Sequence, residues 1–82
     1  MYSLIYSNLS LNQLKNLGKE LQTRIISSLE RIRIRPHHNL KKLVGSPYFR
    51  LRVGDYRVIL EIKSDKLIIF VIEVGHRKDI YK

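Results

Sequence analysis

Three arginines stand at alternating positions around a short turn in the second half of the chain. Arg50 and Arg52 alternate with apolar residues before Gly54-Asp55, and Arg57 follows the turn. Because successive side chains of a strand point to opposite faces, a β-hairpin here places the three guanidinium groups on one face. Arginine stays charged at working pH, and its donor fork fits the oxygens of a phosphate. The spacing therefore indicates a site that holds a phosphate group.

A solvated basic face is the competing interpretation of these residues. If Gly54-Asp55 is a two-residue loop, Arg52 lies directly opposite Arg57, and like charges in that arrangement cost roughly 0.2–1 kcal/mol. Glu61 can neutralise part of the charge. On this feature alone, a phosphate site and a solvated basic surface are equally open.

Proton transfer needs a different kind of residue, because arginine cannot act as an ordinary base. His76 and Arg77 end the last apolar run, and Tyr81 follows them. Histidine exchanges protons near neutral pH, and a tyrosine among arginines is the competing candidate. Since neighbours on a strand point to opposite faces, His76 and Arg77 reach one site together only if Gly75 breaks the alternation.

Other features of the chain favour an anionic partner. It carries 16 basic and 7 acidic residues, a net charge of +9 that is present in both halves and so belongs to the folded surface. Lys41-Lys42 can contact nucleic acid or remain solvated, and Tyr48 and Tyr81 can stack on unpaired bases or form the rim of the core. A basic protein without an anionic partner is the alternative.

Metal and thiol chemistry is not expected. The chain has no cysteine, which excludes disulfides, thiolate zinc sites and cysteine nucleophiles. Adjacent histidines such as His37-His38 seldom bind one ion from an irregular stretch, and no carboxylate cluster accompanies them. We therefore expect neither a metal nor a cofactor.

Length and hydropathy indicate a single domain over residues 1–82, whose 44% hydrophobic content is sufficient for one core. The first six residues lack the features of a signal peptide. No apolar run approaches the ~20 residues of a membrane span. We expect a cytoplasmic protein with no membrane partner.

Periodicity predicts two helices after a short first strand at residues 2–6. Ser7, Asn8 or Ser10 can cap the first helix, and Gly18 is expected to end it. The run from residue 19 to residue 33 has the apolar stripe of an amphipathic helix. These stripes predict the helical part of the core.

An irregular stretch is expected over residues 36–47, and three strands are expected over residues 48–53, 56–63 and 66–74. A turn near Ser64-Asp65 joins the last two strands, and its length decides their register. The last strand is apolar on both faces, which is typical of a central strand.

These segments together resemble the RelE/ParE toxin superfamily of toxin–antitoxin modules. The resemblance covers nearly the whole chain, and its most specific part is the pairing of RVGDYRVI, residues 52–59, with VIEVGHRKDIY, residues 71–81. It implies an α+β fold of order β-α-α-β-β-β. In that fold two N-terminal helices pack on a mostly antiparallel four-stranded sheet, whose other face is concave and basic.

The resemblance also implies an activity. RelE-type members cut messenger RNA in the ribosomal A site, whereas ParE-type members poison DNA gyrase. Similarity to RelE implies a metal-independent, ribosome-dependent endoribonuclease that inhibits translation. Its partners would be the ribosome, messenger RNA and an acidic RelB-like antitoxin, which can link the toxin to operator DNA. A gyrase poison and an inactive antitoxin-binding module are the alternatives.

The positions of the RelE site can be matched in this chain one by one. Arg50 and Arg52 match two basic strand positions, where RelE itself has lysines. Arg57 matches the arginine after the hairpin turn, Arg77 the arginine that ends the last strand, and Tyr81 the C-terminal tyrosine, at a shorter spacing. The resemblance therefore implies that these five residues are catalytic.

Cleavage through attack by a 2′-hydroxyl needs a base, stabilisation of the charged phosphorane and a proton for the leaving oxygen. Arginines meet the second need. Tyr81, His76 and the loop histidines His37 and His38 are the candidates for proton transfer. Tyr48, Lys41 and Lys42 are the candidates for RNA binding.

Overall fold

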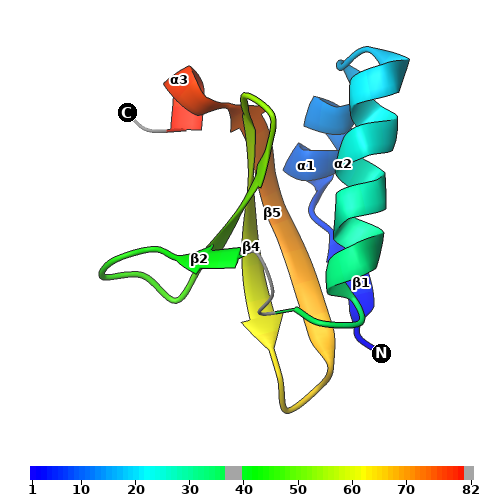
Figure 1. Ribbon diagram of the computed structural model, residues 1–82. Helices are drawn as coiled ribbons and strands as arrows, with labels where there is room; N and C mark the ends of the chain where they lie inside the picture. The colour runs from blue at the N-terminus through cyan, green and yellow to red at the C-terminus, as the bar shows by residue number, and fades with distance from the viewer. Residues whose placement is uncertain (37–39, 81–82) are drawn as a thin grey trace.

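In the computed structural model, which describes residues 1–36 and 40–80, two helices cover one face of a five-stranded sheet (Figure 1). The sheet order is β1-β5-β4-β3-β2, in which β1 is parallel to β5 and the other neighbours are antiparallel. The predicted α+β fold is confirmed. The elements in chain order are β1 (Ser3–Tyr6), α1 (Asn8–Lys15), α2 (Lys19–Ile32), β2 (Leu40–Lys42), β3 (Phe49–Val53), β4 (Tyr56–Lys63), β5 (Ile68–His76) and α3 (Arg77–Ile80).

The sheet has one strand more than the four predicted, and the expectation of an irregular stretch over residues 36–47 is wrong. Strand β2 lies inside that stretch and pairs antiparallel with β3. Three residues are too few to show an alternation. The strand forms because the edge of β3 offers backbone hydrogen-bond partners and because Leu40 packs against the core.

The two N-terminal helices begin as the local sequence requires. The Ser7 hydroxyl caps α1 by accepting a hydrogen bond from the Ser10 amide at 3.0 Å, and it donates to the Ile72 carbonyl at 2.7 Å. Helix α1 ends at Lys15 with Asn16 as its C-cap, whereas Gly18 is the N-cap of α2, so the expectation that Gly18 ends the first helix is wrong. The apolar stripe of α2 is buried against the sheet, with Ile25, Leu29 and Ile32 in the core.

The β3–β4 hairpin has the register that its two-residue turn predicts. Arg52 pairs with Arg57, and Leu51 pairs with Val58. Gly54 occupies the turn with φ +58°, a conformation that residues with a Cβ rarely adopt. Leu51 and Val58 face the helices and are buried, so the alternation assigns the arginines to the other face.

The β4–β5 hairpin contains a feature that the sequence did not predict. Its turn spans four residues, 64–67, and a β-bulge interrupts the ladder because Ile59 pairs with Glu73 while Leu60 pairs with Val71. Ile72 is the additional residue. Both Val71 and Val74 therefore lie in the core, although strict alternation would separate them. As predicted, β5 is an interior strand, between β1 and β4.

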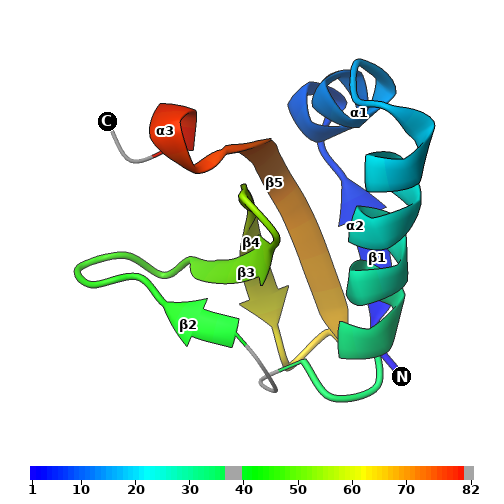
Figure 2. The same ribbon diagram turned by 45° about the horizontal axis from the view of Figure 1, so that its top comes forward.

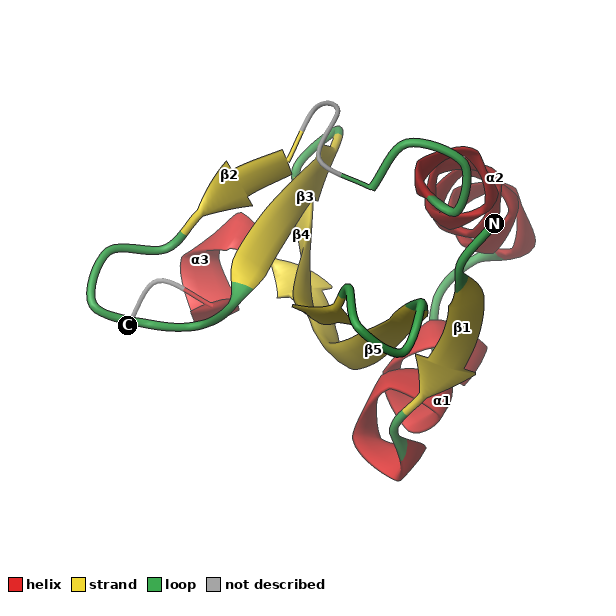
Figure 3. Cartoon of the chain, turned by 90° about the horizontal axis from the view of Figure 1, so that it is seen from below, coloured by secondary structure: helices red, strands yellow, loops and turns green. Residues whose placement is uncertain are grey.

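The remaining element, α3, continues directly from β5 and packs against β4 and β5. Figures 1 and 2 show it on the other side of the sheet from α1 and α2. Seen from below, the two N-terminal helices and α3 likewise lie apart, with the strands between them (Figure 3). Within the described residues, no helix is long and apolar enough to cross a membrane.

Candidate functional site

The sheet face opposite α1 and α2 gathers basic side chains from several strands. Arg52 lies opposite Arg57 on the neighbouring strand, and Lys41 of β2 lies opposite Arg50. Directly opposed residues share a face, as do residues two apart on one strand, so these four cations lie on one side of the sheet. The charge of Arg77 acts on Arg57 as the charges of Arg50 and Arg52 do. We call these four arginines, Arg50, Arg52, Arg57 and Arg77, the arginine cluster.

Arg57 is the centre of the arginine cluster and is buried, with 7% of its surface exposed. Burial lowers the pKa of Arg57, the charges of Arg52, Arg50 and Arg77 lower it further, and Asp55 acts in the opposite direction. A solvated basic face, the competing interpretation of the three hairpin arginines, is therefore wrong for Arg57. Strand β4 lies inside the sheet and α3 packs against it, so its side chains have little contact with solvent.

Arg77 reaches the arginine cluster from the first residue of α3. Its backbone N–H donates to the Asp55 carbonyl at 2.9 Å, which ties the start of α3 to the β3–β4 turn. The side chain is exposed and its charge acts on Arg57. The tertiary structure therefore brings together arginines that lie 20 positions apart in the sequence.

His76 lies on the other side of the sheet from the arginine cluster. It pairs with Tyr56, which pairs in turn with the buried core residue Val53. Its ring contacts the Tyr56 ring edge-on, with centroids 5.4 Å apart, and borders a cleft of about 310 Å³ beside Gln13 of α1. Gly75 pairs with Arg57 in an unbroken ladder, so the alternation that separates His76 from the cluster is intact there.

The predicted RNA-binding residues lie on the β2–β3 hairpin, which extends away from the helices (Figure 2). Lys41 and Lys42 of β2 are exposed, and Tyr48, just before β3, exposes 37% of its surface. The Tyr48 amide donates to the Ser46 hydroxyl at 3.1 Å, which orders the tip. Tyr81 and His37-His38 lie outside the described residues. Among the residues that are described, no cluster of potential metal ligands occurs.

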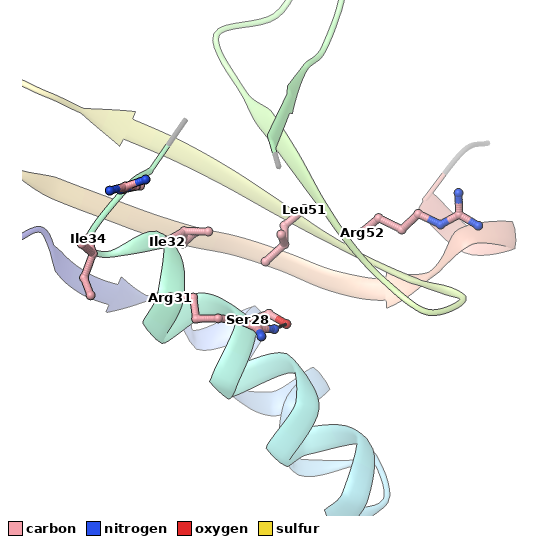
Figure 4. A pocket seen from close by; sticks show the side chains of 7 residues that line it. Ser28, Arg31, Ile32, Ile34, Leu51 and Arg52 are labelled. Atoms are coloured by element: carbon pink, nitrogen blue, oxygen red, sulfur yellow. Dashed lines mark hydrogen bonds between the residues drawn. The ribbon is translucent and has the colours of Figure 1, made fainter. Parts of the chain in front are cut away.

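A cleft of about 500 Å³ between α2 and β3 was not predicted from the sequence. Ile32, Ile34 and Leu51 give it apolar walls, while Leu51 and Arg52 point to opposite sides of β3 (Figure 4). The signal that could have revealed it is the spacing of polar residues along α2 and beyond. The polar residues that line the cleft from this segment are Ser28, Arg31 and Arg35.

The arrangement of the arginine cluster limits the chemistry it can perform. Four guanidinium groups can bind and neutralise an anion, but arginine does not serve as an ordinary general base. Burial of Arg57 keeps its charge in a less polar environment, where it acts more strongly on a nearby phosphate than it would in water. The cluster is therefore suited to electrostatic stabilisation of a phosphate.

Comparisons with known proteins agree with this description. The mRNA interferase toxin RelE of Escherichia coli is 28% identical over 80 residues, which cover 94% of this chain and 84% of RelE. The RelB–RelE antitoxin–toxin complex of Methanococcus jannaschii contains a chain that is 29% identical, with a TM-score of 0.76 and 94% of each chain covered. The E. coli RelBE toxin–antitoxin complex has the same fold, with a TM-score of 0.84 at 24% identity over 93% of this chain and 96% of that one.

The family model of the ParE toxin of type II toxin–antitoxin systems matches residues 4–81. That match spans β1 to the segment after α3 and includes the whole arginine cluster. It confirms the superfamily that the paired motifs around the hairpin and the last strand predicted. This chain is therefore a toxin of the ParE family of type II toxin–antitoxin systems, within the RelE/ParE superfamily.

Proposed function

We propose that this toxin is a ribosome-dependent endoribonuclease that cleaves messenger RNA in the A site and thereby inhibits translation. The observation that carries the proposal is the buried Arg57 with Arg50, Arg52 and Arg77 around it. Like charges held this close destabilise the free protein, and a phosphate bound among them would relieve that repulsion. The mRNA interferases that resemble this chain over 94% of its length support the same activity.

In this mechanism the arginine cluster binds the scissile phosphate and stabilises the charge that develops on the phosphorane. Arg57 supplies a preorganised cation, and Arg77 and Arg52 supply donors beside it. His76 faces away from the cluster, so we assign proton transfer to Tyr81. Lys41, Lys42 and Tyr48 would hold the RNA that flanks the cleavage site, through its phosphates and by stacking.

Cleavage in a translating extract tests this function. We expect RNA breaks that map to codons in the ribosomal A site and that require the ribosome. Because the matching family model is that of ParE toxins, a gyrase poison is the second candidate. Double-strand DNA breaks trapped with gyrase, together with intact messenger RNA, would replace the first proposal by the second. We expect either activity, RNA cleavage or gyrase poisoning, to persist after divalent metal has been removed from the toxin by chelation.

We further propose that an acidic antitoxin neutralises this toxin and connects it to operator DNA, and that one antitoxin segment lies in the cleft between α2 and β3. The net charge of +9 favours an acidic partner. The cleft combines apolar walls with three exposed cations, Arg31, Arg35 and Arg52, and Ile34 is 66% exposed. An apolar side chain flanked by carboxylates fits this surface.

Charge reversal in the cleft tests the position of the antitoxin. We expect Arg31→Glu and Arg35→Glu to raise the Kd for the acidic protein encoded beside the toxin by about tenfold or more each, because each creates like-charge repulsion in the interface. Lys19→Glu is the matched control, since Lys19 is an exposed cation at the other end of α2. Equal weakening by all three variants, measured by calorimetry, would show that only net charge matters and would exclude this docking site.

A further inference from the structure

Two backbone amides are fixed at the point where β5 passes into α3. The Arg77 N–H donates to the Asp55 carbonyl at 2.9 Å, and the Lys78 N–H donates to Nδ1 of His76 at 3.2 Å. Lys78 is the second residue of α3, so His76 occupies the N-cap position. At that position a side-chain acceptor satisfies an amide that has no partner within the helix. The His76 ring therefore has the capping role that a Ser, Asp or Asn side chain has at most helix N-termini.

The His76 ring is held in place by a second contact, on the side of the sheet that α1 and α2 cover. It meets the Tyr56 ring edge-on, at an interplanar angle of 78°. The contact with the Lys78 amide points Nδ1 of the ring toward the start of α3. Tyr56 and the Lys78 amide together define one orientation of the ring.

We propose that His76 is a positioning residue, which caps α3 and thereby holds Arg77 beside Arg57 without touching the RNA. Helix α3 has only four residues, and so short a helix forms only when its ends are held by other groups. Arg77 is the first of these residues and is exposed. The cap therefore acts together with the bond from the Arg77 N–H to the Asp55 carbonyl to keep the Arg77 backbone, and with it the guanidinium, in one place.

The catalytic consequence rests on the proposed nuclease function, whereas the cap itself does not. A guanidinium that is free to move by an ångström loses much of its effect on a transition state. Removal of the cap should therefore slow cleavage through Arg77. This assigns to His76 a role that differs from proton transfer and that operates from the opposite face of the sheet.

Two substitutions separate the cap from the packing of the ring. His76→Asn keeps an acceptor that is favoured at N-caps but removes the contact with Tyr56. His76→Phe keeps an aromatic ring against Tyr56 but has no acceptor. Hydrogen exchange of the Lys78 amide in the free toxin measures directly whether the hydrogen bond of the cap is present. We expect protection to fall about tenfold or more in His76→Phe and to stay within about threefold of wild type in His76→Asn.

Single-turnover cleavage on programmed ribosomes gives the second readout. We expect His76→Phe to be slower by about tenfold or more, His76→Asn to cleave within about threefold of wild type, and His76→Phe to add nothing to Arg77→Ala in the double variant, because the two residues act as one unit. His76→Ala, which lacks the acceptor and introduces no bulk, replaces His76→Phe if that variant does not fold.

The proposal is overturned if His76→Asn loses Lys78 protection as His76→Phe does, since the ring contact would then be what matters. It is also overturned if His76→Phe slows cleavage by the same factor in the presence and absence of Arg77. A wild-type toxin that cleaves no RNA would remove the proposed function. Hydrogen exchange of the Lys78 amide would still show whether His76 caps α3.

Discussion

We expect replacement of Arg57 by alanine to slow cleavage of messenger RNA on programmed ribosomes by about 10²–10³-fold, the loss that follows removal of one preorganised donor to a developing oxyanion. Arg57 lies at the centre of the arginine cluster and is the member that is buried. Its charge would therefore act on a bound phosphate through a less polar medium than the charges of Arg50, Arg52 and Arg77, which are more exposed. Single-turnover rates at saturating toxin measure the effect on the chemical step without a contribution from binding.

The buried position of Arg57 requires controls that separate charge from packing. Arg57→Met fills most of the side-chain volume without a charge, and it removes the repulsion between directly opposed Arg52 and Arg57. We expect its thermal unfolding midpoint to be at least that of wild type while its cleavage is as slow as that of Arg57→Ala. Arg57→Lys keeps the charge but not the planar fork, so an intermediate rate is expected.

Lys66→Met is the matched control for loss of a positive charge. Lys66 lies exposed in the turn between β4 and β5, away from the arginine cluster, and we expect its variant to cleave as wild type does. Cleavage by Arg57→Met at the wild-type rate would show that the buried cation is structural. Slow cleavage by both methionine variants would instead point to ribosome binding through net charge.

Tyr81→Phe is expected to have the second large effect, a loss of about 10²-fold in the rate of cleavage, as removal of a group that transfers a proton does. None of the arginines can exchange a proton, and His76 lies on the other face of the sheet. Helix α3 ends at Ile80, so Tyr81 follows the element that carries Arg77. The phenol of Tyr81 is therefore our candidate for proton transfer.

Rates across a range of pH distinguish proton transfer from a contribution to binding. Tyr81→Phe should lower the rate at saturating toxin and flatten its pH dependence, whereas loss of binding alone would disappear at saturation. Tyr2→Phe removes the same hydroxyl from a tyrosine that packs against the core and should leave the rate unchanged. If Tyr81→Phe cleaves within about tenfold of wild type, proton transfer belongs to water or ribosomal RNA, and the toxin contributes electrostatics alone.

The sequence by itself was sufficient to predict the hairpin and the face on which its arginines lie. A two-residue turn with a glycine sets the register of the strands that it joins, and the alternation of Leu51 and Arg52 then sorts side chains by face. Both signals are local, so one chain segment contains all the information. The paired motifs at residues 52–59 and 71–81 also indicated the superfamily, because they extend the resemblance from the hairpin to the last strand.

Only the tertiary structure decided the burial of Arg57, the place of His76 and the existence of β2. Each depends on residues that are distant in the chain. Arg57 is buried because α3 and two flanking strands surround β4, and β2 forms because β3 offers it an edge. The bulge at Ile72 shifts the pairing of β4 with β5 by one residue, and one residue is enough to exchange the two faces of a strand. The face of His76 was therefore set by a pairing that no local pattern in β5 encodes.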